Sequence, residues 1–167
     1  MLSTNRCFVL LGIAATAVVC TSPAASAQTG LLFTPIAPCR IVDTRNAGGT
    51  LTSGVPRTIT VNSGGPTANY SSQGGTSSGC GIPTDAKSVF FNFVVVAPST
   101  IGDLQAWPVG TTIPAASISN FANLPGFNIA NGIAVPVCTT SCATGDLNVQ
   151  LNNASAWLVV DVVGYFK

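Results

Sequence analysis

Short stretches in which apolar and polar residues alternate recur along the chain. This period of two is typical of β-strands that bury one face. The clearest examples are RTITV at 57–61 and DLNVQL at 146–151. The stretch SVFFNFVVVA at 88–97 is so apolar that we expect it to be the most deeply buried strand. Further strands are expected at 40–45, 103–107, 117–121, 128–137 and 157–165.

Segments rich in Gly, Pro, Ser and Asn separate these strands, and no segment has the 3.6-residue period of a helix. Eight or nine short strands at even spacing predict an all-β fold, either an antiparallel β-sandwich or a jelly roll, with minimal helix. The short turn 98–102 predicts that 88–97 and 103–107 pair as a hairpin. Gly-Asp-Leu opens a strand at both 102–104 and 145–147, which suggests two similar hairpins.

The segment 62–81 consists almost wholly of Ser, Gly, Thr, Asn and Gln. Long polar loops are often functional or simply mobile. The uniform composition favours a surface insertion over a site, with Cys80 anchoring its far end.

The first 27 residues have the features of a signal peptide. An apolar run at 8–19 precedes Ala-Ser-Ala at 25–27, which favours cleavage after Ala27. A lipid-anchored Cys20 is the alternative, but Val19 is bulky where a small residue is expected. The run is too short to span a membrane comfortably, and nothing later resembles a transmembrane segment. We therefore expect an exported protein, secreted or at the cell surface.

An apolar arm at 28–37 precedes a single β-sandwich domain at 38–167. Pro35 and Pro38 rule out a helix and suit an edge strand or a docking arm. The arm could add to the sheet of a neighbouring subunit or fold back on its own sheet, and edge strands do either.

Charge is scarce, with six Lys or Arg, five Asp, no Glu and no His in 167 residues. Loss of Arg6 with the signal peptide leaves a formal net charge of zero. Nucleic acid is then not expected as a partner because phosphate binding requires a basic patch. A net charge near zero also removes the repulsion that opposes self-association.

Four cysteines remain after the signal peptide: Cys39, Cys80, Cys138 and Cys142. They allow three pairings. We favour Cys39 with Cys80 and Cys138 with Cys142, because the second pair can close a small loop. A zinc site at 138–142 is the other interpretation, disfavoured by the absence of histidine and the expected oxidation of the thiols. No metal and no cofactor are expected.

Three charges lie within PCRIVDTR at 38–45. On a strand, Asp43 and Arg45 share one face and could form a partly buried ion pair beside a cross-link. Asp161 lies within LVVDVV, where an unpaired carboxylate would be costly. We expect it to pair with Arg40 or Arg45, which joins the first strand to the last; a cation ligand is the disfavoured alternative.

Three motifs, PCRIVDTR at 38–45, CGIP at 80–83 and DVVGYF at 161–166, occur in this order. The chain resembles a group of secreted bacterial β domains with such an opening and close, most of them functionally uncharacterised. The resemblance implies a β-sandwich, a bridge between Cys39 and Cys80 and an extracellular setting. It supplies no catalytic residues, and it does not include Cys138 and Cys142.

The inventory of side chains excludes most catalysis. Without histidine there is no catalytic triad and no imidazole base. Asp103 and Asp146 could form a glycosidase pair if the two predicted hairpins were neighbours, but each also suits a turn at a strand entrance. We expect no enzymatic activity.

Carbohydrate binding is the main alternative function, with Trp107, Trp157 and Tyr70 as possible stacking residues. Large aromatic residues on apolar strands are, however, usually core. Asn69 and Asn153 stand in glycosylation sequons. Overall we expect a secreted, non-enzymatic structural protein of the bacterial cell surface or matrix that self-assembles as a filament or surface layer, through its arm or its sheet edges. A carbohydrate-binding or adhesion module, with glycans as partners, is the alternative.

Overall fold

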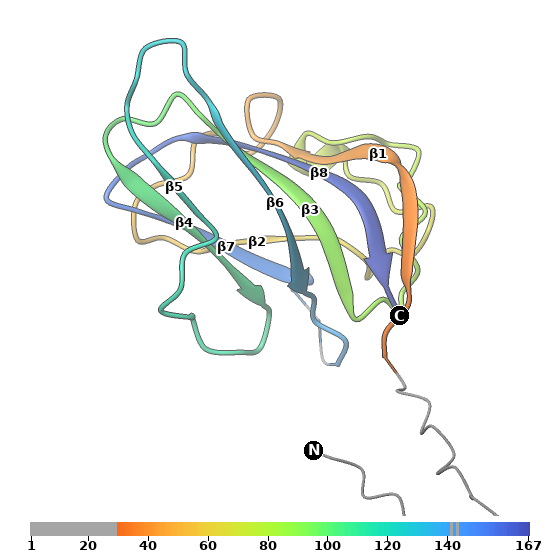
Figure 1. The fold of residues 1–167 in the computed structure, drawn as a ribbon. Coiled ribbons are helices and arrows are strands. Elements are labelled where there is room, and N and C mark those ends of the chain that lie inside the picture. The colour runs from red at the N-terminus through yellow and green to blue at the C-terminus, as the bar shows by residue number, and fades with distance from the viewer. Residues whose placement is uncertain (1–29, 141, 143) are drawn as a thin grey trace, which may run out of the picture. The chain divides into compact units, whose positions relative to one another are not determined.

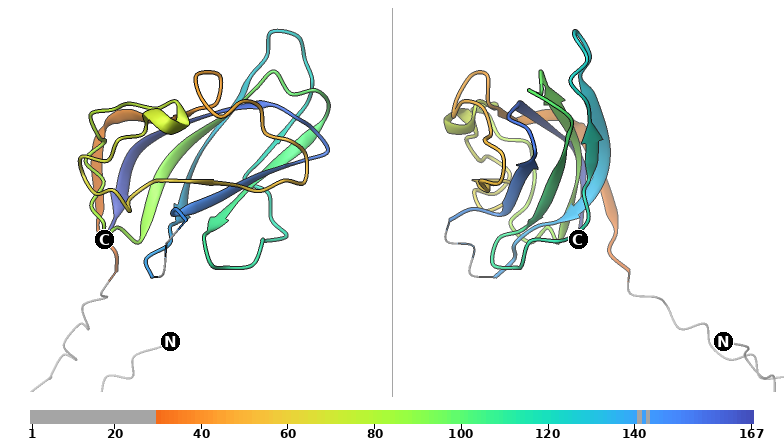
Figure 2. Two further views of the ribbon diagram at one scale, coloured as in Figure 1. Left: turned by 180° about the vertical axis from the view of Figure 1, so that it is seen from behind. Right: turned by 90° about the vertical axis from the view of Figure 1, so that its left-hand side faces the viewer.

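The computed structural model describes residues 30–140, 142 and 144–167, so the expected signal peptide lies outside it. Two four-stranded antiparallel sheets face one another (Figure 1; Figure 2). In spatial order, the first sheet contains β1 (Phe33–Asp43), β8 (Trp157–Phe166), β3 (Ser88–Val96) and β6 (Ile129–Pro136). The second contains β2 (Arg57–Ile59), β7 (Leu147–Asn152), β4 (Gly102–Pro108) and β5 (Ser119–Phe121). The expected all-β class is confirmed.

Helix is confined, within the described residues, to one 3₁₀ turn at Ser71–Gln73. No helix in this part of the chain is long and apolar enough to cross a membrane.

The strand order follows from one long antiparallel ribbon wrapped on itself. β1 pairs with β8, β2 with β7, β3 with β6 and β4 with β5. Every connection except that from β4 to β5 therefore crosses from one sheet to the other. Pairing of β3 with β8 and of β4 with β7 completes the sheets. Of the two architectures predicted, this order is that of a jelly roll.

The predicted hairpin of 88–97 with 103–107 is wrong. β3 and β4 belong to different sheets, and the chain turns between them through Ala97 at a positive φ of 48°. The second predicted hairpin fails in the same way, because β6 and β7 also lie in different sheets. The repeated Gly-Asp-Leu instead marks two equivalent crossings into the second sheet, where β4 and β7 are antiparallel neighbours.

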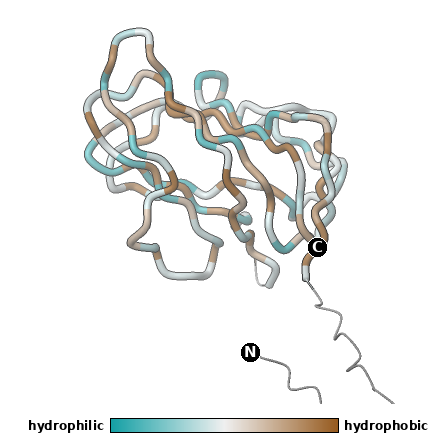
Figure 3. The backbone as a smooth tube through the Cα atoms, viewed as in Figure 1, coloured by the Kyte–Doolittle hydropathy of each residue, from teal (hydrophilic) through white to brown (hydrophobic). Residues whose placement is uncertain are grey.

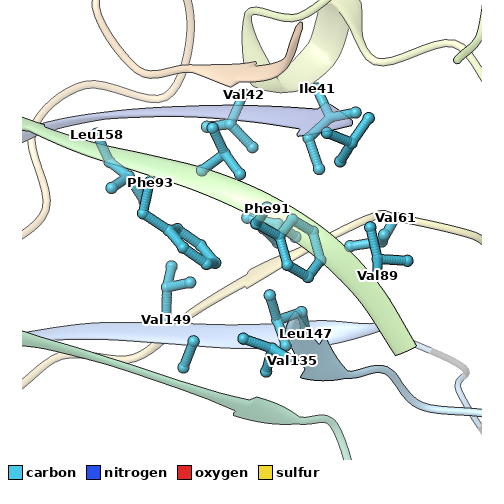
Figure 4. Packing of buried hydrophobic residues seen from close by; sticks show 14 of the residues in the cluster. Ile41, Val42, Val61, Val89, Phe91, Phe93, Val135, Leu147, Val149 and Leu158 are labelled. Carbon is cyan, nitrogen blue, oxygen red and sulfur yellow. The ribbon is translucent and has the colours of Figure 1, made fainter. Parts of the chain in front are cut away.

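The core fills the space between the sheets (Figure 4). Val89, Phe91, Phe93 and Val95 alternate along β3 and are at most 1 % exposed. The Phe91 and Phe93 ring centroids lie 5.1 Å apart. Leucine and valine side chains of β7 point toward them from the opposite sheet. The strand expected to be most buried is thus central to the core.

The apolar arm folds onto its own sheet. β1 begins at Phe33, which is the register partner of Phe166 at the end of β8. Leu32 and Lys167 extend the pairing, each donating its backbone N–H to the other's carbonyl at 2.8 and 3.2 Å. A single strand, β1, therefore runs across the predicted boundary between an arm at 28–37 and a domain from residue 38.

The polar segment 62–81 is not the surface insertion that was expected. Tyr70 within it is fully buried. The Gln73 amide nitrogen donates to the carbonyls of Ile41 and Thr60, both at 2.9 Å, and its oxygen accepts from the Thr60 N–H at 3.0 Å. One side chain thus joins β1 to the chain that leaves β2. The segment is part of the framework, which its composition alone does not reveal.

Candidate functional site

A β-bulge in β1 gathers the charged residues of the opening motif. The register with β8 shifts between Arg40 and Val42, and both Ile41 and Val42 are buried. Strict alternation predicted Arg40 and Asp43 on opposite faces. The extra residue brings them to one side, where their side chains meet.

Four charged groups form a continuous chain there. Arg40 binds Asp161 through two contacts, Nε to Oδ1 at 2.8 Å and a terminal nitrogen to Oδ2 at 3.1 Å. Its other terminal nitrogen reaches Asp43 Oδ2 at 3.3 Å. Arg45 donates two hydrogen bonds to the same Asp43 carboxylate, from Nε to Oδ1 at 2.8 Å and from a terminal nitrogen to Oδ2 at 2.6 Å. Arg45 lies in the turn after β1 and not in the strand itself. The predicted ion network of Arg40, Asp43, Arg45 and Asp161 is present.

This chain of charges neutralises itself and ties the first strand to the last. The hydrogen bonds from Arg45 hold the pKa of the buried Asp43 carboxyl below its usual 3.8, against the cost of burial. The hydrogen bond to Asp161 raises the pKa of Arg40. Because each charge faces an opposite one, we assign the network to bracing the fold.

Both predicted disulfides form. The bond between Cys39 and Cys80 spans a sequence separation of 41 and fixes the far end of the polar segment beside β1. The bond between Cys138 and Cys142 spans a separation of four and closes the turn before β7. No three His, Cys or Asp side chains gather as a metal site would require in the described ranges.

Asp146 has a structural role that differs from the two considered from the sequence, a glycosidase carboxylate and a turn residue. It is 1 % exposed. Its Oδ2 accepts the backbone N–H groups of Val61, Asn62 and Ser63, at 2.6, 2.8 and 2.9 Å. Consecutive backbone N–H groups of this kind form an anion-binding nest. Here the occupant is the protein's own carboxylate, so Asp146 fixes the chain that leaves β2.

Asp103 and Asp146 do not form a carboxylate pair. Asp103 lies opposite Asn152 at one end of the β4–β7 ladder, whereas Leu147, next to Asp146, lies opposite Pro108 at the other end. The two carboxylates therefore do not face each other across a cleft, as a glycosidase would require.

Two of the three possible sugar-stacking residues are unavailable for stacking. Tyr70 has no exposed surface and donates its hydroxyl to the Val61 carbonyl at 2.5 Å. Burial, followed by the charge of Asp146, raises the pKa of Tyr70 to about 12. Trp107 is only 6 % exposed, and Trp157 is half-buried on β8. The alternative in which Tyr70 and Trp107 stack on sugar is not supported, because both rings are buried, as large aromatic residues on apolar strands usually are.

Both sequon asparagines are exposed. Asn69 Oδ1 accepts from the Ser71 N–H at 2.9 Å and from the Ser71 hydroxyl at 2.6 Å. Asn153 has a positive φ of 63° in the turn between β7 and β8. Glycosylation at both positions stays a prediction.

A row of polar side chains crosses the outer face of the second sheet. Asn120 on β5, Asp103 on β4 and Asn152 on β7 are direct cross-strand partners, and we call them the amide row. The Asn152 amide donates to Asp103 Oδ1 at 2.9 Å and to Gln105 Oε1 at 3.0 Å. The row ends at a pocket of about 600 Å³ between the loops at this end of the sandwich.

Apolar residues recur along the strands of the first sheet (Figure 3). Phe33, Phe90 and Phe166 cluster at one end, with ring centroids 6.4 and 5.0 Å from that of Phe33. At the edge of this sheet, β6 presents exposed Ala130 and Ala134.

Comparison with known proteins found no matching family model, no matching curated protein and no matching solved structure.

Proposed function

We propose that this chain is a non-enzymatic structural subunit of an extracellular assembly, and that copies associate through the open edge of β6. The observation that carries the proposal is the nature of this edge. β6 has eight residues, IANGIAVP, with no charge and with proline only at its last position. Within the described sheets it has one strand neighbour, β3. A long, uncharged edge strand is a template for pairing with another chain.

The other three edges are less suited to pairing. Loop residues cover the end of β1, because the Thr76 N–H donates to the Arg40 carbonyl at 3.0 Å and Gly74 forms a bridge with Val42; the earlier part of β1 carries Pro35 and Pro38, which cannot donate a backbone N–H. β2 and β5 have only three residues each. The arm, the other route considered from the sequence, is already paired with β8 of its own chain.

The face next to β6 also supports association. Ala130, Gly132 and Ala134 are exposed and lie opposite Val94, Asn92 and Phe90 of β3 in the register. Small residues at an edge permit a second backbone to approach closely. The formal net charge of zero expected after signal-peptide removal removes the long-range repulsion between copies.

An extracellular location agrees with two disulfides, which persist in oxidising compartments. Export by cleavage after Ala27 is part of the proposal, as is the resemblance of the opening and closing motifs to secreted bacterial domains. N-terminal sequencing of the exported protein tests cleavage, with Gln28 expected as the first residue.

The assembly is tested by light scattering coupled to size-exclusion chromatography, over a range of protein concentrations. The full chain is expressed with export and purified from the periplasm or medium. We expect the wild type to form oligomers and the double variant Ala130→Lys/Ala134→Lys to elute as a monomer, since two lysines charge the edge.

The matched control is Thr112→Lys/Ala115→Lys, which adds the same charge at exposed positions of the β4–β5 loop. It should oligomerise like the wild type. A wild type that stays monomeric at all concentrations contradicts the proposal, and so does equal dissociation of both lysine variants.

A further inference from the structure

The amide row is organised in advance by its own hydrogen bonds. Gln150 donates to Asn152 Oδ1 at 2.9 Å, Asn152 donates to Asp103 and Gln105, and Gln105 donates to the Pro114 carbonyl at 2.7 Å. Gln105 and Gln150 are each 8 % exposed and are the next cross-strand pair on the same face, so two buried amide side chains adjoin the row. Such a network fixes the rotamers of its outermost members before any ligand arrives.

Two polar atoms at the Asn120 end of the row make no hydrogen bond within the described part of the chain. Asn120 Oδ1 accepts from the Ser117 hydroxyl at 3.2 Å. Among the described residues, however, neither the Asn120 amide nitrogen nor Asp103 Oδ2 has a hydrogen-bonding partner. Because Asn120 and Asp103 are direct cross-strand neighbours, one donor and one acceptor stand side by side. Adjacent hydroxyl groups, each both donor and acceptor, match such a pair.

The pocket beside this pair adds an apolar wall. It is lined by Ile101, Asp103, Asn120, Phe121, Ile129 and Asn153, among others. Ile101 is 69 % exposed, although it is a large apolar side chain. Figure 1 shows the β3–β4 and β5–β6 loops together at this end, and Asn123 of one donates to the Ser99 carbonyl of the other at 3.1 Å. An apolar pocket with a few fixed polar groups is the usual form of a small-molecule site.

We propose that this pocket binds an uncharged sugar residue of an oligosaccharide. Two neighbouring hydroxyl groups would bond to Asp103 Oδ2 and the Asn120 amide, and the C–H face of the ring would contact Ile101. A phosphate or carboxylate ligand is disfavoured because Asp103 is the one charged residue among the described residues that line the pocket. The site differs from the aromatic one that the sequence suggested.

This inference does not rest on assembly, because β6 contributes only Ile129 to the pocket. The two proposals therefore fail independently. Binding is measured on the wild type and on Ala130→Lys/Ala134→Lys alike, whichever oligomeric state each adopts.

The test begins with a printed array of uncharged oligosaccharides and continues with calorimetry on the strongest ligand and on cellohexaose, mannohexaose and chitohexaose. We expect at least one to bind. Asp103→Asn and Asn120→Ala should each weaken that binding by about tenfold, the effect of losing one good hydrogen bond.

Asp85→Asn and Asn69→Ala are the matched controls, because both positions are exposed and remote in sequence from the pocket. They should bind like the wild type, and thermal unfolding verifies that all four variants fold. The proposal is overturned if no array member or hexasaccharide binds at 1 mM, or if Asp103→Asn and Asn120→Ala bind as tightly as the controls.

Discussion

At the scale of single residues, most of the few charged side chains stabilise the fold. Asp43, Asp161, Arg40 and Arg45 neutralise one another, and Asp85 pairs with Lys167 at 3.3 Å. Asp146 is held by backbone N–H groups instead. Among the aspartates Asp103 is the exception, because its Oδ1 accepts only from the Asn152 amide and the residue lines a pocket.

Replacing Asp146 by alanine should destabilise the protein by about 3 kcal/mol, because three backbone N–H groups lose a charged acceptor in a buried site. Asp146→Asn keeps an acceptor oxygen and should fall between the wild type and Asp146→Ala. Urea unfolding measures the difference. Asp85→Ala, which removes an exposed ion pair, should change the free energy of unfolding by less than about 1 kcal/mol. Equal effects of Asp146→Ala and Asp85→Ala would refute the role given to Asp146.

Asp43 makes stability depend on pH in a defined direction. Its pKa lies below 3.8 in the folded protein, so its charged form stabilises the fold above the unfolded value. That contribution is lost as the pH falls through the lower folded pKa. Asp43→Asn should therefore be less stable than the wild type at pH 7, and the gap should narrow below about pH 4. Unfolding midpoints from pH 7 to 2.5 measure this gap, and a constant gap over that range would exclude the effect.

The sequence predicted one half of this residue-scale picture. The pairing of Asp161 followed from the cost of an isolated carboxylate among valines. The role of Asp146 could not be predicted, because its three donors at 61–63 are more than 80 residues away in the chain and no local pattern marks them. The position after Gly145 resembles an ordinary turn.

At the scale of elements, alternation located the strands but not their partners. β3 and β4 are joined by a turn short enough for a hairpin, yet the chain crosses to the other sheet. Alternation reports which face of a strand is buried, and both arrangements bury the same face of β3. The polar segment 62–81 was misjudged for a related reason: Tyr70 and Gln73 act through backbone contacts that composition does not encode.

The two disulfides should differ in their effect on stability. In the chain-entropy model, removal of the bond with a separation of 41, by Cys39→Ser/Cys80→Ser, costs about 4 kcal/mol. Removal of the bond with a separation of four, by Cys138→Ser/Cys142→Ser, costs about 2 kcal/mol. Unfolding in urea of each double variant measures these values. A larger loss for the second pair would contradict this order of the two disulfides.

At the scale of the whole molecule, the jelly roll leaves one long edge open. Each sheet packs one face against the other sheet. In the first sheet β6 is an edge strand, and within the described sheets its one strand neighbour is β3. This edge became visible only with the topology, because the sequence of β6 reads like any half-buried strand. An uncharged edge on a protein of near-zero net charge is the basis of the proposed assembly.

Hydrogen–deuterium exchange at increasing protein concentration tests that assembly most directly. If copies pair through β6, the backbone N–H groups of 129–135 that face away from β3 become bonded, and their exchange slows as the concentration rises from about 1 µM to 1 mM. The β4–β5 loop at 109–118 should exchange at the same rate throughout. Exchange within β6 that does not depend on concentration, while oligomers are present, would contradict pairing through this edge.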